Sequence, residues 1–348
     1  MMLNIPPQLL TFYCPFEDEV SPERDLLVKN TLDWARQFDL GEGDADRCTQ
    51  LALTGSVFMA HVYPHARGPL AQALSDYSAW GWLTNDFSDS PRPVGELMPD
   101  LGRWERMMRA PASWPSSTRP AEKALRNVLV RLQRCMTAVQ WQRFTAAQCH
   151  WMHAVAWTAS LRAKGGEQTV NDYLASRMAS GGGYAATGYI DAVEGIELDE
   201  KQWSRPDVRA AAEALMTTSV LDNDRYSHLR ELQLPDPKHN LFAALRREHP
   251  EMAPEGAILE GVAIRDRCMN LYLALREQIL VDVDDDLKRY LIGLERIVSG
   301  NIAFAAKAVR YLVPDLTPSL SRTPTPSYSG TTPLPYPTIV WWWDHLHR

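Results

Sequence analysis

Three oxygen-bearing side chains recur at four-residue steps late in the sequence: Asn223, Ser227 and Glu231. In an α-helix each such step rotates by only about 40°, so all three share one face over two turns. Amide, hydroxyl and carboxylate oxygens suit Mg²⁺, which also takes ligands from substrate phosphates. The pattern therefore predicts a divalent metal site, with a solvated polar stripe on a helix surface as the alternative.

A second polar stripe ends an aromatic run near residue 80. Asn85 and Asp89 are four residues apart with Asp86 between them, and Pro91 closes the expected helix. Carboxylates at the mouth of an apolar pocket are costly unless they are paired or bind metal. Two such stripes at the ends of apolar helices predict one shared metal–phosphate site.

Both stripes resemble motifs of one enzyme family. The run Asn223-Asp224-x-x-Ser227-x-x-Arg230-Glu231 resembles the NSE motif of bacterial-type class I terpene synthases, and Asn85-Asp86-x-x-Asp89 is similar to their aspartate-rich motif. The resemblance covers about residues 12 to 314. Further matches are Arg177 at the place of the diphosphate-sensor arginine and Arg310-Tyr311 at the place of the terminal RY pair.

The resemblance implies a magnesium-dependent enzyme that ionises a linear prenyl diphosphate and cyclises the carbocation. Three Mg²⁺ ions are expected between the stripes, held by Asn85, Asp86, Asp89, Asn223, Ser227 and Glu231. The departing diphosphate would be neutralised by Arg177, Arg230, Arg310 and Tyr311. The departure from the family is Asn85, where an aspartate normally bridges two metals. The amide supplies one neutral oxygen, so either metal binding on that side is weaker or Asp86 and Asp89 carry more of it.

A glycine-rich segment after Arg177 predicts a helix break, because three glycines do not sustain a helix interior cheaply. By resemblance, Ser180 stands at the linker position, where the family usually has aspartate, and Gly181 stands at the effector position facing the ionising carbon. Because serine replaces the usual aspartate, the link between the sensor Arg177 and the effector Gly181 is expected to differ from that of the family.

The carbocation needs an apolar pocket without trapping nucleophiles. Aromatic faces attract cations by roughly 0.5–2 kcal/mol each, and the candidates are Phe58, Trp82, Tyr184 and Phe304, with ordinary core packing as the alternative for each. Ser78 and Gly81 precede Asn85 by seven and four residues and leave room on the same helical face. That room favours geranylgeranyl over farnesyl diphosphate.

The elements that position these residues follow the helical period from about Glu23 to Pro314. The expected fold is all-α: a single-domain class I terpenoid synthase bundle of roughly ten helices with a central apolar cavity. Helical stretches are expected at Leu26–Phe38, Cys48–Val62, Ala121–Ala163, Asp207–Leu232, Ala257–Leu280 and Asp286–Tyr311. The acidic run Asp282 to Asp286 is expected to form a loop and the negative start of a helix.

The domain is expected to span residues 1–314, followed by a tail at 315–348 that is rich in Pro, Ser and Thr and ends in Trp341-Trp342-Trp343. Such a composition buries little apolar surface and usually behaves as a linker. The tryptophans predict a clip folded back onto the domain or onto a partner chain, with a lid over the active site as the alternative.

The composition of the chain argues against several classes of binding partner. The net charge of −7 without a basic block argues against nucleic acid, and five scattered cysteines without paired spacing predict neither disulfides nor a zinc site. The sequence contains no run of about 18 consecutive apolar residues, so no membrane-spanning helix is predicted. A cytoplasmic protein is expected. The resemblance also allows a homodimer. Two alternatives to a cyclase are a chain-elongating prenyltransferase and a non-catalytic prenyl-diphosphate-binding homologue.

Overall fold

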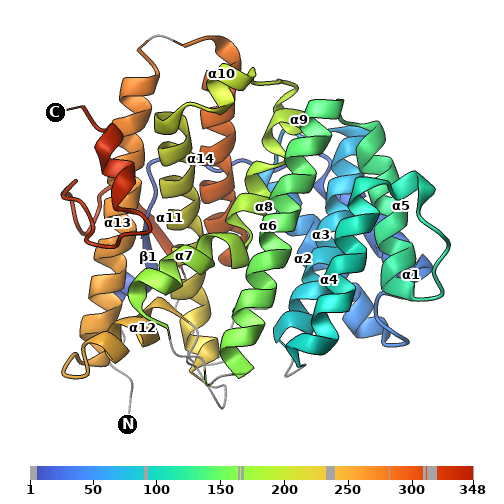
Figure 1. Ribbon diagram of the computed structural model, residues 1–348, viewed down its shortest axis with the longest axis horizontal. Coiled ribbons are helices and arrows are strands. Elements are labelled where there is room, and N and C mark those ends of the chain that lie inside the picture. Colours follow the sequence, from blue (N-terminus) through green and yellow to red (C-terminus); the bar gives the residue numbers. More distant parts are fainter. Residues whose placement is uncertain are drawn as a thin grey trace.

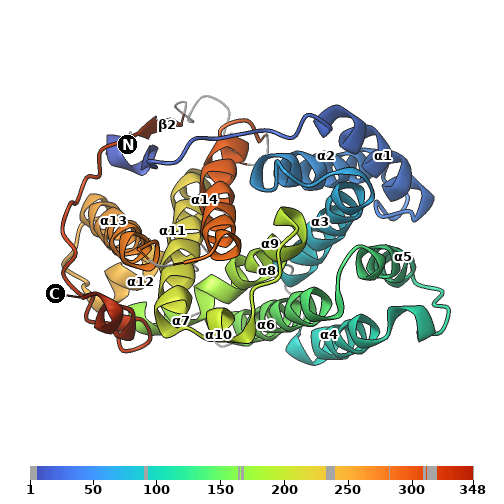
Figure 2. The ribbon, with the colours of Figure 1, turned by 90° about the horizontal axis from the view of Figure 1, so that it is seen from above.

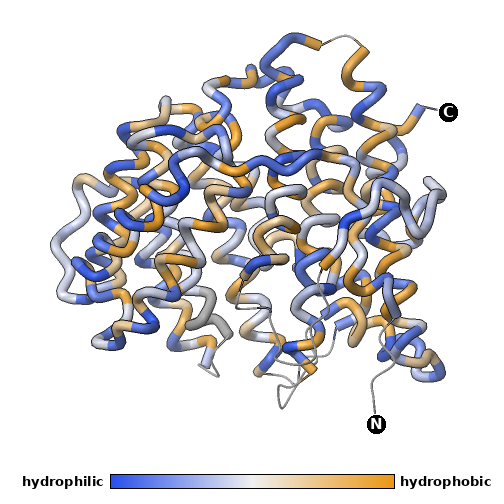
Figure 3. The backbone as a smooth tube through the Cα atoms, turned by 180° about the vertical axis from the view of Figure 1, so that it is seen from behind, coloured by the Kyte–Doolittle hydropathy of each residue, from blue (hydrophilic) through white to orange (hydrophobic). Residues whose placement is uncertain are grey.

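The structure is a computed structural model that describes residues 6–89, 93–163, 165, 168–232, 240–281, 283–308, 311 and 320–347, with side chains omitted for 85–89. It is mostly helical, and the all-α prediction is confirmed. Coloured by hydropathy, the helices alternate between apolar and polar residues along their length (Figure 3). Each helix therefore has a face to bury against its neighbours.

The helices form two groups with a short middle group between them (Figures 1 and 2). The first group is α1 (Arg24–Gln37), α2 (Ala45–Val62), α3 (Gly68–Asp89), α4 (Val94–Arg109), α5 (Pro120–Arg134) and α6 (Ala138–Ala163). The middle group is α7 (Val170–Ser180), α8 (Gly183–Thr187), α9 (Ile190–Glu194) and α10 (Glu200–Trp203). The last group is α11 (Pro206–Glu231), α12 (Leu241–Glu248), α13 (Pro254–Ile279) and α14 (Asp285–Ala305). Three 3₁₀ helices, η1 (Pro7–Leu9), η2 (Pro111–Ser113) and η4 (Val340–His345), complete the described helical elements.

Helix α11 is buried on nearly all sides. It begins at Pro206, whose missing N–H suits the first helical position, and almost every residue from Val208 to Leu229 is buried. Four alanines at 210, 211, 212 and 214 let its neighbours approach closely. It contacts α7, α8, α13, α14 and η4, so the predicted metal stripe lies on the central helix of the last group.

Two glycines allow close helix crossings around α2. A Cβ at Gly55 would lie 2.4 Å from the Ala79 backbone nitrogen of α3, and a Cβ at Gly300 of α14 would lie 2.2 Å from the His61 carbonyl oxygen. No side chain fits at either crossing, so glycine is needed there. The crossings bring α3 and α14 against the same helix.

The stretch Ala121–Ala163, expected to be helical throughout, forms two helices. Thr137 accepts a hydrogen bond on its hydroxyl from the Gln140 N–H at 3.2 Å, and the Gln140 side chain accepts one from the Thr137 N–H at 3.0 Å. This Thr-x-x-Gln capping box starts α6. At the acidic run the prediction is confirmed for the described residues, since the Asp284 carboxylate caps α14 by accepting from Leu287 N–H at 3.0 Å.

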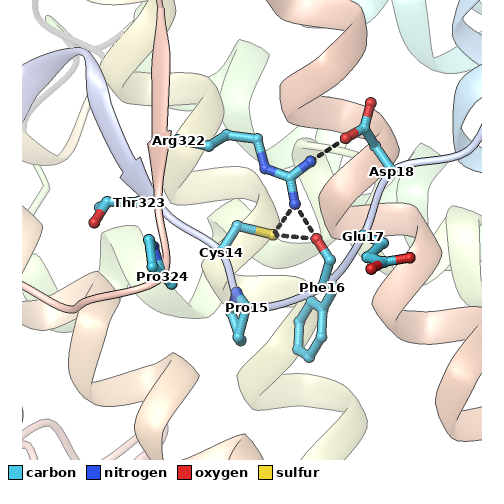
Figure 4. A pocket seen from close by; sticks show the side chains of 8 residues that line it. All are labelled: Cys14, Pro15, Phe16, Glu17, Asp18, Arg322, Thr323 and Pro324. Atoms are coloured by element: carbon cyan, nitrogen blue, oxygen red, sulfur yellow. Dashed lines mark hydrogen bonds and ion pairs between the residues drawn. The ribbon is translucent and has the colours of Figure 1, made fainter.

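A small parallel sheet joins the two ends of the chain. Strand β1 (Thr11–Tyr13) pairs with β2 (Ser321–Thr323), with Thr11 opposite Ser321. In Figure 4 the Arg322 side chain of β2 points at Cys14, Phe16 and Asp18, beside a surface pocket of about 440 Å³. Sequence periodicity missed both strands because each is three residues long.

The described part of the C-terminal segment packs on the domain instead of behaving as a linker. It passes along the outside of α13 and ends with η4 beside α11 (Figure 2). Trp342 is 1% exposed and donates from Nε1 to Glu213 Oε2 of α11 at 3.0 Å. The backbone of Thr338 donates to Asn171 of α7 at 3.0 Å. The prediction of a clip folded back onto the domain is confirmed. The buried tryptophans supply the apolar contact that the Pro-, Ser- and Thr-rich remainder of the segment lacks.

Candidate active site

The predicted metal stripe lies at the C-terminal end of α11. Ser227 Oγ donates to Glu231 Oε1 at 2.7 Å, and Glu231 Oε2 accepts from Asn240 Nδ2 at 2.8 Å. A hydroxyl that donates its proton keeps acceptor lone pairs, so Ser227 can hold a cation while bonded to Glu231. Two hard oxygen donors and the Asn223 amide oxygen on one face fit a magnesium ion.

Sequence analysis missed Asn240. Its side-chain oxygen caps α12 by accepting from the Ala243 N–H at 2.9 Å, and its amide nitrogen donates to Glu231, nine residues earlier in the sequence. An asparagine before a helix signals a cap. Its contact with Glu231 has no local sequence signal.

Arg177 of α7 reaches the first residue of the stripe. Its Nη2 donates to Asn223 Oδ1 at 2.8 Å, and its Nε donates to Asp224 Oδ1 at 2.9 Å. The other Asp224 oxygen accepts from the Tyr173 hydroxyl at 2.5 Å and from the Leu241 N–H at 3.1 Å. Burial raises the pKa of Asp224 and Arg177 opposes that rise. Arg177 and the first residue of the predicted metal stripe therefore belong to one hydrogen-bonded polar cluster.

Tyr311 approaches the same asparagine from the other side. Asn223 Nδ2 donates to the Tyr226 hydroxyl at 2.9 Å and to the Tyr311 hydroxyl at 3.2 Å. The Tyr226 hydroxyl donates in turn to Asn301 Oδ1 of α14 at 3.0 Å. Asn223 is thus the point where α7, α11 and residue 311 converge.

The helix break falls where the glycines predict it. Helix α7 ends at Ser180, Gly182 has φ +83°, and α8 starts at Gly183. A Cβ at Gly181 would lie 3.0 Å from Arg177 Nη1 and 2.8 Å from Val220 Cγ1. The Arg177 guanidinium therefore lies directly against the break, and the Ser180 hydroxyl donates to the Arg177 carbonyl at 3.5 Å.

Three of the four predicted pocket aromatics form one ring cluster. The Phe58 ring centroid lies 5.2 Å from that of Phe304 and 6.0 Å from that of Trp82, and Phe304 lies 6.4 Å from Tyr311. These contacts connect α3, one turn before Asn85, to the stripe on α11 through Tyr311 and Asn223. An aromatic cluster therefore joins Trp82 of α3 to the predicted stripe on α11.

The other three residues predicted to line the pocket have different surroundings. A Cβ at Gly81 would meet no atom within 4 Å, so this position borders open space, whereas Ser78 is buried. Tyr184 differs from the prediction, because its hydroxyl donates to Glu213 Oε1 at 2.9 Å and its ring lines a surface pocket with Trp341 and His345. The break at Gly182 redirects the chain, so α8 turns Tyr184 toward the C-terminal segment.

The other predicted metal and diphosphate ligands are described only in part. Arg230 is half-buried one residue before Glu231, and a seven-residue step of about 700° places it close to the direction of Asn223. The backbone of Asn85, Asp86 and Asp89 belongs to the end of α3. Their side chains and Arg310 lie outside the described residues. No helix in the described ranges is long and apolar enough to cross a bilayer.

Comparison with known proteins identifies the family. The profile of the family described as terpene synthase family 2, C-terminal metal binding, matches residues 76–270. Diterpene cyclase DtcycB from a Streptomyces species is 40% identical over 90% of this chain and 91% of its own. The (+)-T-muurolol synthase of Streptomyces clavuligerus, described as cyclising (2E,6E)-farnesyl diphosphate, is 29% identical over 96% of this chain and 82% of its own.

A solved structure matches over the whole fold. The SVS_A2 protein from ancestral sequence reconstruction superposes with a TM-score of 0.83 at 26% identity, covering 96% of this chain and 98% of that one. The family profile spans the described part of the NSE-like stripe, Arg177 and the glycine break. The chain therefore belongs to the bacterial class I terpene synthases, enzymes of a metal-binding family, and is a terpene cyclase.

Proposed function

We propose that this cyclase uses Mg²⁺ to ionise a linear prenyl diphosphate, with geranylgeranyl diphosphate favoured over farnesyl diphosphate, and cyclises the cation to a polycyclic terpene. The observation that carries the proposal is the convergence of Arg177 and Tyr311 on Asn223, at 2.8 and 3.2 Å. A diphosphate-binding arginine and a phenol thereby border a face of oxygen ligands. Three ions are expected, as in the family that this chain resembles.

The proposed division of labour follows from donor chemistry. Asn223, Ser227 and Glu231 hold metal on the α11 side, with Asp89, Asp86 and Asn85 opposite. When bound, the cations neutralise charge that develops on the departing diphosphate. Arg177 and Arg230 donate to the diphosphate oxygens, together with Arg310, because a guanidinium fork reaches two phosphate oxygens at once. The Tyr311 hydroxyl donates to the same group.

The initial carbocation is proposed to form beside the α7–α8 break. Gly181 lies against Arg177, so a carbon attached to a diphosphate held by Arg177 would be close to the backbone of this break. Phe58, Trp82 and Phe304 then present ring faces and edges without a nucleophile that traps the cation. Ser180 is proposed to connect the arginine with the break.

Two observations favour a C20 substrate. A Cβ at Gly81 would meet no atom within 4 Å, which leaves room on α3 about one turn before Asn85, and the relative with 40% identity is a diterpene cyclase. The muurolol synthase, which is 29% identical to this chain, is described as cyclising a C15 diphosphate. The preference for a C20 over a C15 substrate is therefore tested directly.

The test is product analysis by mass spectrometry after incubation with C10, C15 and C20 diphosphates and Mg²⁺. We expect a cyclic C20 hydrocarbon or alcohol, no product in EDTA, and no diphosphate release by Glu231→Ala. A predominantly C15 product would overturn the substrate preference alone. A longer linear diphosphate would instead identify a chain-elongating prenyltransferase. Binding of a prenyl diphosphate without turnover of any of the three substrates would identify a non-catalytic binding homologue.

A further inference from the structure

A fully buried group of four charges lies behind the metal face of α11. Asp222 and Arg225 on α11 and Arg265 and Asp266 on α13 are each at most 1% exposed. Arg265 holds Asp222 by two bonds, Nε to Oδ1 at 2.9 Å and Nη2 to Oδ2 at 2.6 Å. Arg225 Nη1 donates to the same Asp222 Oδ1 at 2.9 Å. Two cations and two anions make the group neutral, and we call it the four-charge network.

The network ties a segment near each end of the chain to the α11–α13 pair. Arg225 Nη2 donates to the carbonyl oxygens of Gln8 at 2.5 Å and Thr11 at 2.7 Å, near the N-terminus. Asp266 Oδ2 accepts from the backbone N–H groups of Ser327 at 2.8 Å and Tyr328 at 3.1 Å, in the C-terminal segment. The β1–β2 pairing joins the same two segments a few residues away.

The network and the candidate ligands occupy opposite faces of one helix. At about 100° per residue, the mean direction of Asp222 and Arg225 is roughly 170° from that of Asn223, Ser227 and Glu231. Rotation of α11 about its axis would therefore move both faces together. Tyr226 links them directly, since its ring lies 6.2 Å from Phe12, which stacks on Arg225, and its hydroxyl accepts from Asn223.

Stability alone does not account for such a network. Transferring ions into a protein interior costs several kcal/mol each, and well-packed apolar replacements are often neutral or stabilising. Directional bonds between fixed forks and carboxylates, in contrast, allow only one rotational setting of α11 against α13. Metal ligands need positions accurate to about half an ångström, which requires a rigid support.

We propose that the four-charge network is a positioning device that fixes the rotation of α11 and thereby sets the metal affinity of its ligand face. This inference rests on the proposed function, because it takes Asn223, Ser227 and Glu231 as metal ligands. The four residues act through α11 and do not touch substrate. The two chain ends are parts of the same device.

The experiment measures Mn²⁺ binding in the presence of inorganic diphosphate by isothermal titration calorimetry, alongside melting temperature. In Arg225→Met, Asp222 keeps its bonds to Arg265, but the backbone carbonyls of Gln8 and Thr11 lose their hydrogen-bond donor. In Asp266→Asn, the link to the C-terminal segment loses its charge. Each variant is expected to raise the apparent Kd for Mn²⁺ by about 3- to 10-fold. If Arg225→Met does not fold, Asp266→Asn decides the result.

The matched control is Tyr272→Phe, which removes a buried bond to Glu295 at 2.7 Å elsewhere on α13. We expect it to lower the melting temperature without changing the Kd for Mn²⁺. Wild-type affinity in both network variants, or a loss of affinity that merely follows melting temperature in all three, overturns the inference. Failure of the wild type to bind Mn²⁺ with diphosphate, or unchanged binding by Glu231→Ala, would contradict the proposed function instead.

Discussion

Arg177 donates to Asn223 across the gap between α7 and α11, with 2.8 Å between Nη2 and Oδ1. The same guanidinium pairs with the buried Asp224, so one side chain serves both the fold and the candidate site. Removing the arginine altogether would leave a buried carboxylate without its cation, which is strongly destabilising. Loss of activity in an alanine variant would therefore mix two causes.

Arg177→Lys separates them. Lysine keeps a cation near Asp224 but lacks the planar fork that reaches both Asp224 and Asn223. We expect kcat/KM to fall by about 100-fold, with a smaller loss of melting temperature than in Arg177→Ala. Arg205→Lys, at another forked arginine–aspartate pair beside α11, is the control and should keep activity. Equal losses in both lysine variants would argue against a role in diphosphate binding.

Gly81→Leu tests the length of the cavity. The glycine borders open space, so a leucine fits the fold; in the proposed site it would fill room that the C20 chain uses. Turnover of geranylgeranyl diphosphate is expected to fall by about tenfold or more relative to farnesyl diphosphate. Gly102→Leu on α4 also meets no atom within 4 Å of the new Cβ and is the matched control. An unchanged ratio of the two substrates would show that Gly81 does not border the bound chain.

Trp342→Ala tests the docking of the C-terminal segment. The substitution empties a buried site and leaves Glu213 without the indole donor, so the free energy of unfolding should fall by about 3–5 kcal/mol. Trp341→Ala removes a half-buried ring over Arg209 and should cost about 1 kcal/mol or less. Urea denaturation measures both. Similar small effects would mean that η4 is not anchored through Trp342 in solution.

His61 predicts a pH dependence of stability. Burial, followed by the charges of Lys307 and Arg24, lowers the pKa of His61. The unfolded chain therefore takes up a proton below about pH 6.5 while the folded protein does not, so stability falls as pH decreases through this range. His61→Leu should weaken this fall by about 0.5–1 kcal/mol between pH 7.5 and 5.5. A pH profile parallel to that of the wild type would contradict the assignment.

Sequence alone determined the local features of this protein. Helical period is a property of neighbouring residues, so the main helices and the common face of Asn223, Ser227 and Glu231 followed from spacing. The break after Ser180 followed from glycine chemistry, and the start of α14 followed from the acidic run before it. The family resemblance supplied the enzyme class, which the relatives bear out. The assignments of individual residues within the site stay predictions.

Only the tertiary structure decided which distant residues meet. Asn240 at Glu231, Tyr173 at Asp224 and Arg265 at Asp222 are contacts between helices, and no periodicity encodes a partner on another element. Tyr184 donates to Glu213 and lines a surface pocket beside the C-terminal segment, a placement that depends on the packing of α8 against α11. The C-terminal segment became ordered through a few buried tryptophans and backbone bonds, which an average over its composition does not reveal. Helix faces follow from neighbours in sequence, whereas partners follow from how those faces pack in three dimensions.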